Sequence, residues 1–96
     1  MNKREAREIQ AARIEELRRL SYQELVERLV DTGPLTEEIV GPSGTTYQLE
    51  IQGLWDDKRN STLRVLVSID DGGWRSFMPL GGADFIMRPD GSFVDE

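Results

Sequence analysis

Carboxylates in predicted loops are the side chains of this sequence that could do chemistry. Asp70 and Asp71 open an Asp-Asp-Gly-Gly turn, and four more aspartates fall in other predicted loops: Asp56, Asp57, Asp84 and Asp90. If these loops met at one end of a sheet, their oxygens would suit Ca²⁺ or Mg²⁺, and a pair of them could serve glycoside hydrolysis. Aspartate also starts turns by bonding to its own backbone, and the spacing matches no EF-hand. A metal site at Asp70 and Asp71, or a small hydrolase, is therefore the alternative hypothesis.

Other routes to catalysis lack their usual side chains. The chain contains no cysteine and no histidine. This excludes disulfides and thiolate nucleophiles, and it removes the commonest zinc ligands and the commonest general base at neutral pH. The segment 41–44, Gly-Pro-Ser-Gly, has no following lysine and precedes a predicted strand, so it indicates a hairpin turn rather than a phosphate cradle. The sequence therefore predicts no cofactor and favours a protein that is not an enzyme.

Length and charge narrow the possible partners. The 96 residues fit a single domain, 1–96, which is too small for a cleft between two lobes. The net charge is −6, and residues 31–96 hold five Lys and Arg against twelve Asp and Glu. Such an acidic region disfavours nucleic acids and anionic membranes. The start of the chain is charged and no apolar run reaches membrane-spanning length, so we expect a cytoplasmic protein.

The composition and capping pattern of residues 1–31 predict that they form the helical segment of the domain. Residues 3–20 contain no Gly or Pro and are rich in helix formers, and Ser21 with Glu24 forms a capping-box signature for a second helix over 22–31. Gly33 and Pro34 then end the helical segment. On one continuous helix, the apolar residues before Ser21 and those after it would lie nearly half a turn apart around the axis. Either the chain bends at Ser21, or the helix continues and offers one of its two apolar faces to something other than its own sheet.

The pattern of apolar residues and turns in residues 35–96 predicts an antiparallel sheet. Alternating apolar residues give strands over 45–55 and 62–70, and shorter strands precede and follow them. A two-residue Asp71-Gly72 turn would pair Ile69 with Trp74, Val67 with Ser76 and Val65 with Met78, and Gly53 would mark a bulge. The predicted fold is α+β: an N-terminal helix or bent helix pair on an antiparallel meander of about five to six strands.

The second half of the chain resembles small bacterial proteins of unknown function. The resemblance rests on the run from Val65 to Phe77, followed by 84–86 and 89–93. Because no activity is known for such proteins, the resemblance implies no function here.

Two apolar features exceed what a solvated surface needs and point to a partner. One is the stripe of the first helix, formed by Ala6, Ile9, Leu17 and Leu20; the other is the pair Leu66 and Phe77 on the outer sheet face, flanked by Arg64 and Arg75. The stripe could fold back over Leu66 and Phe77, or it could bind a protein partner or a second copy. Its interruption by Arg13 favours the second possibility. The leading hypothesis is a non-catalytic protein-interaction or regulatory module.

Overall fold

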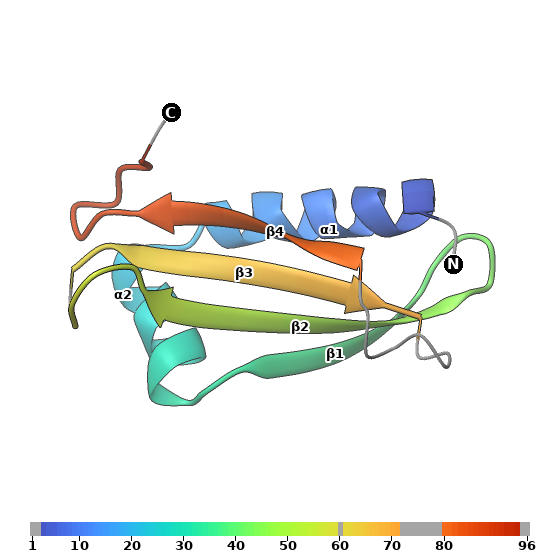
Figure 1. Ribbon diagram of the computed structural model, residues 1–96, viewed down its shortest axis with the longest axis horizontal. Helices are drawn as coiled ribbons and strands as arrows, with labels where there is room; N and C mark the ends of the chain where they lie inside the picture. Colours follow the sequence, from blue (N-terminus) through green and yellow to red (C-terminus); the bar gives the residue numbers. More distant parts are fainter. Residues whose placement is uncertain (1–2, 60, 72–79, 95–96) are drawn as a thin grey trace.

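The computed structural model describes residues 3–59, 61–71 and 80–94. The chain begins with helix α1 and continues through a short helix α2 into a π-helical segment η1, before four strands follow (Figure 1). Their bounds are α1 Lys3–Arg18, α2 Tyr22–Leu25, η1 Val26–Asp31, β1 Leu35–Val40, β2 Thr46–Trp55, β3 Leu63–Asp70 and β4 Leu80–Met87.

The strands form one antiparallel sheet in the order β1-β2-β3-β4, so the predicted α+β class is confirmed. The predicted five to six strands were too many, since the described residues contain four. Gly81 and Gly82 lie inside β4. Residues 92–94 add only an isolated bridge between Met87 and Phe93 rather than a further strand.

The predicted pairing of β3 was wrong. Val65 pairs with Phe85, Val67 with Ala83, and Leu66 with Asp84, so the strand that returns beside β3 lies further along the chain than a two-residue turn allows. The predicted partners, which include Phe77, and the neighbouring Arg75 lie outside the described residues. Lengthening a connection costs little entropy, and the observed register buries Phe85 and Met87.

The core lies on one face of the sheet, here called the inner face. Alternate residues of β2 and β3 point to this face and are at most 1% exposed: Tyr47, Leu49, Ile51, Leu63, Val65, Val67 and Ile69. Helix α1 runs over β3 and β4, and η1 packs against β2 (Figure 1).

The apolar stripe of α1 belongs largely to this core. Ala6 and Leu17 are buried, and Ile9 and Leu20 pack against the core while partly exposed. The stripe does not cover Leu66, which alternates with the buried Val65 and therefore points to the outer face. The expectation that the domain leaves this stripe unburied was wrong, because the chain bends and both helical stripes reach the same face.

The bend occurs at Ser21, as the capping signature predicted. The Ser21 hydroxyl accepts a hydrogen bond from the Glu24 backbone N–H at 3.1 Å, and the Glu24 carboxylate accepts one from the Ser21 backbone N–H at 3.4 Å. These two bonds satisfy donors that the start of a helix leaves unpaired. The new helix therefore begins in its own direction, with Leu25 and Leu29 fully buried.

Gly53 allows the helical segment to approach the sheet closely. It pairs with Val65 in regular register, so the predicted bulge at this position is absent. A Cβ at Gly53 would lie 2.8 Å from the Leu29 Cβ. The register irregularity lies instead between Val67 and Ile69, where the buried Gln10 amide donates to the Val67 carbonyl oxygen at 3.0 Å.

We expect Gly53→Ala to lower the free energy of unfolding by about 1–3 kcal/mol, because the added methyl group would push η1 away from β2. Chemical denaturation measures this change. Gln52→Ala on the same strand, whose side chain points to the outer face, is the matched control and should change stability by about 0.5 kcal/mol or less. An unchanged or higher stability of Gly53→Ala would contradict the close packing.

Candidate functional site

The aspartate-rich loops do not converge. Asp56 follows the end of β2, beside the start of β3, whereas Asp70 ends β3. The length of β3 separates the two ends by about 24 Å. Across residues 3–59, 61–71 and 80–94, no group of three acidic side chains is placed to hold a metal ion.

Arg64 organises the carboxylates on the outer face. Its guanidinium donates to the Asp56 carboxylate at 2.9 Å and also forms an ion pair with Asp84. The hydrogen bonds that Arg64 donates to Asp56, and then the one to Asp84, raise the pKa of Arg64. Arg64, predicted as a partner contact, is thus engaged by carboxylates of its own chain, and Leu66 lies half-buried on the same face.

A second polar cluster surrounds Glu5, which lies in the first turn of α1 and is only 9% exposed. Tyr47 donates its hydroxyl to the Glu5 carboxylate at 2.7 Å, and Ser43 donates both its hydroxyl at 2.7 Å and its backbone N–H at 2.9 Å. A Cβ at Gly41 would lie 2.5 Å from the Glu5 Oε1 atom, so the carboxylate needs glycine there. The hairpin turn predicted at 41–44 is present, and it receives a side chain that sequence periodicity gave no reason to place there.

The Glu5 cluster is not poised for acid-base catalysis. Hydrogen bonds from Tyr47 and then from Ser43 lower the pKa of Glu5. Burial first, and then Glu5 itself, raise the pKa of Tyr47. Both shifts keep Glu5 ionised and Tyr47 protonated at neutral pH, whereas a general base needs a pKa near the working pH. The cluster ties the start of α1 to the turn between β1 and β2.

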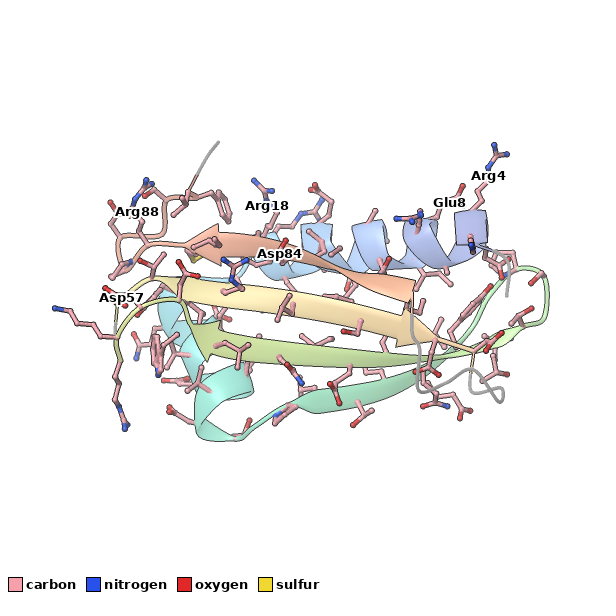
Figure 2. All side chains as sticks on the ribbon, viewed as in Figure 1. Arg4, Glu8, Arg18, Asp57, Asp84 and Arg88 are labelled. Carbon is pink, nitrogen blue, oxygen red and sulfur yellow. The ribbon has the colours of Figure 1, made fainter. Side chains whose placement is uncertain are left out.

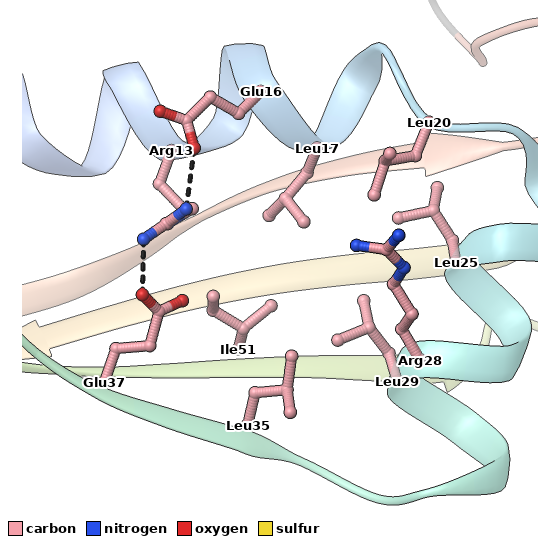
Figure 3. A pocket seen from close by; sticks show the side chains of 10 residues that line it. All are labelled: Arg13, Glu16, Leu17, Leu20, Leu25, Arg28, Leu29, Leu35, Glu37 and Ile51. Atoms are coloured by element: carbon pink, nitrogen blue, oxygen red, sulfur yellow. Dashed lines mark hydrogen bonds and ion pairs between the residues drawn. The ribbon is translucent and has the colours of Figure 1, made fainter.

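A groove opens between α1 and β1, where none of the described helices lies directly above the inner face (Figure 3). Helix α1 lies over β3 and β4, and α2 with η1 closes one end of the groove. The hollow has a volume of about 230 Å³. Its lining residues are Arg13, Glu16, Leu17, Leu20, Leu25, Arg28, Leu29, Leu35, Glu37 and Ile51.

The groove has an apolar floor and a charged rim. Leu35 stands at the β1 side with 40% of its surface exposed. Arg13 links α1 to β1 through Glu37 at 2.5 Å and also binds Glu16 at 2.6 Å (Figure 3). Arg28, from η1, lies over the opposite end, and its guanidinium is 3.7 Å from Glu24. Both signs of charge therefore border an apolar depression.

The size of the groove limits what it can hold. Pockets for cofactors and drug-sized ligands typically measure about 300–1,000 Å³, so this hollow suits one or two apolar side chains. It includes Leu17 and Leu20 of the predicted partner-binding residues, whereas Ile9 is not among its lining residues. Sequence reasoning missed Leu35, Ile51 and Arg28, because the part of a sheet that a helix leaves open depends on packing.

Comparisons with protein-family models, curated proteins and solved structures found no match. In the described part of the chain, no helix combines the length and apolar character needed to cross a bilayer.

Acidic pH should reduce the contribution of the Glu5 cluster to the stability of the fold. Because folding lowers the pKa of Glu5 below 4.5, its stabilisation is present above this value and is lost as the pH falls through the folded-state pKa. Glu5→Gln should therefore be less stable than the natural protein at pH 7, and the gap should narrow on acidification. Denaturant unfolding at a series of pH values measures the gap.

Glu8→Gln is the matched control for this experiment, because Glu8 is exposed on the same helix (Figure 2). Its stability should follow that of the natural protein at each pH. A gap for Glu5→Gln that stays constant from neutral to acidic pH would show that ionisation of Glu5 does not stabilise the fold.

Proposed function

We propose that this chain is a non-catalytic protein-interaction module whose groove between α1 and β1 receives apolar side chains of a protein partner. The observation that carries the proposal is the apolar hollow itself, with Leu35 40% exposed at its rim. An apolar depression bordered by polar groups is typical of a protein-binding surface. Cytoplasmic location and the absence of nucleic-acid binding, both expected from the sequence, are parts of the same proposal.

The groove is built from side chains that the core already holds in place. Leu17 comes from α1, Leu25 from α2, Leu29 from η1 and Ile51 from β2, and each is at most 8% exposed. A preformed site loses little conformational entropy when it binds. An apolar anchor entering such a pocket can supply much of the affinity of a small interface.

The carboxylate alternative has weaker support. Asp56 and Asp70 lie near opposite ends of β3, and Arg64 engages both Asp56 and Asp84. The best-enclosed carboxylate, Glu5, has a pKa shifted away from neutrality. These features favour binding over hydrolysis as the function of the chain.

The proposal predicts that peptides selected on this protein from a random library depend on Leu35. Leu35→Asp should weaken their binding about tenfold or more, since burying a leucine contributes about 1.5–3 kcal/mol. Leu54→Asp is the matched control, because Leu54 is 47% exposed on β2 and points to the outer face. Fluorescence polarisation with labelled peptides measures both affinities.

Thermal unfolding of both variants separates lost binding from lost folding. Selected peptides that bind both aspartate variants as well as the natural protein, or that lose equal affinity for both, would contradict a role for the groove.

A further inference from the structure

Strand β1 forms one edge of the sheet beside the groove. Within the described residues β1 pairs only with β2, so one side of the strand presents backbone N–H and C=O groups without strand partners (Figure 1). Such an edge is a template for an additional strand. The inner-face side chains of an added strand would lie next to Leu35 and extend towards the groove.

The outer face beside this edge is acidic. Glu38 lies on β1, and Glu50 lies on β2 directly opposite Thr36. Both glutamates are exposed, and each accepts a hydrogen bond from a neutral amide, Glu38 from Gln48 at 3.0 Å and Glu50 from Gln52 at 2.6 Å. Neither has an ion pair in the part of the chain that the structure describes. Cationic side chains from a new strand would complement them.

We propose that β1 binds an extended peptide in which Lys or Arg alternates with apolar residues. In this arrangement the backbone of the peptide pairs with β1. Its cationic side chains lie over Glu38 and Glu50, and its apolar side chains turn towards the groove, because successive residues of a strand point to opposite faces. The inference rests on the proposed function and specifies the chemistry of the partner.

The same charges disfavour a second copy as the occupant of this edge. If two β1 strands paired near their centres, Glu37 or Glu38 of one copy would lie opposite Glu37 or Glu38 of the other. Like charges directly opposite each other destabilise a strand pair. The edge thus fits a basic strand better than its own.

Three short synthetic peptides test the proposal on the full chain. One alternates Lys with Leu, the second replaces each Lys by Glu, and the third repeats the first with alternate backbone nitrogens methylated. The basic peptide should bind at least about tenfold more tightly than the acidic one. The methylated peptide should lose binding, since it keeps the side chains but cannot pair with the edge. Amide NMR titration measures affinity, and hydrogen exchange should show new protection in β1.

Charge reversal on the protein should reverse this preference. The double variant Glu38→Lys, Glu50→Lys should bind the acidic peptide more tightly than the basic one. The matched control is Glu8→Lys, Asp57→Lys, which changes net charge equally at exposed positions away from this edge (Figure 2). The control should keep the preference of the natural protein. A reversal in both double variants would show attraction by net charge alone and would overturn the proposal.

The remaining outcomes separate this inference from the proposed function. Library-selected peptides that need Leu35 but show neither a basic preference nor protection of β1 would refute strand addition and leave the groove as a binding site. If Leu35→Asp affects no selected peptide, both proposals fail. A dimer seen by light scattering, with β1 amides protected before any peptide is added, would make a second copy the occupant and overturn the basic-peptide assignment.

Discussion

The rest of this structure depends on the burial of one face of the sheet, four-stranded in the described residues, by two helical pieces: the 16-residue α1 and the segment formed by α2 and η1. A single straight helix could not place both of its apolar stripes on that face, since they lie nearly half a turn apart. The capping box at Ser21 and Glu24 resolves this by starting a new helix in a new direction. Gly53 then lets η1 lie directly on β2. The helix break at Ser21 and the glycine at position 53 thus both allow η1 to pack against β2.

The helical layer covers the sheet unevenly, and the groove is the result. Helix α1 occupies the side of β3 and β4, while α2 and η1 occupy one end, so the region between α1 and β1 is bridged mainly by the Arg13–Glu37 ion pair. This pair is partly buried, since the side chains of Arg13 and Glu37 are 24% and 36% exposed. The Glu5 cluster ties down the far end of α1 through hydrogen bonds to a buried carboxylate. A rigid floor with a polar rim suits binding better than bond cleavage.

The structure shows where several acidic side chains of the strand region lie. Glu38 and Glu50 lie together beside the unpaired edge, whereas Asp56 and Asp84 are held by Arg64 further across the outer face. The excess of negative charge is therefore not evenly spread. Part of it, Glu38 and Glu50, lies next to β1, which is one of the two edge strands of the described sheet and the one that borders the groove. A partner strand at this edge could therefore contact the acidic outer face and the apolar groove together.

The sequence by itself determined the fold class, the helix break at Ser21, the turn at 41–44 and the strand cores of β2 and β3. These depend on local signals: capping side chains, turn residues and alternation of apolar residues. Only the tertiary structure decided that β3 pairs with residues 80–87, that Gly53 serves close packing, and that Glu5 reaches Ser43 and Tyr47. Each of these depends on contacts between residues distant in the chain, where the gain from burying side chains such as Phe85 outweighs a local turn preference. The groove belongs to the same class, because no periodicity in α1 reveals which strands the helix will leave uncovered.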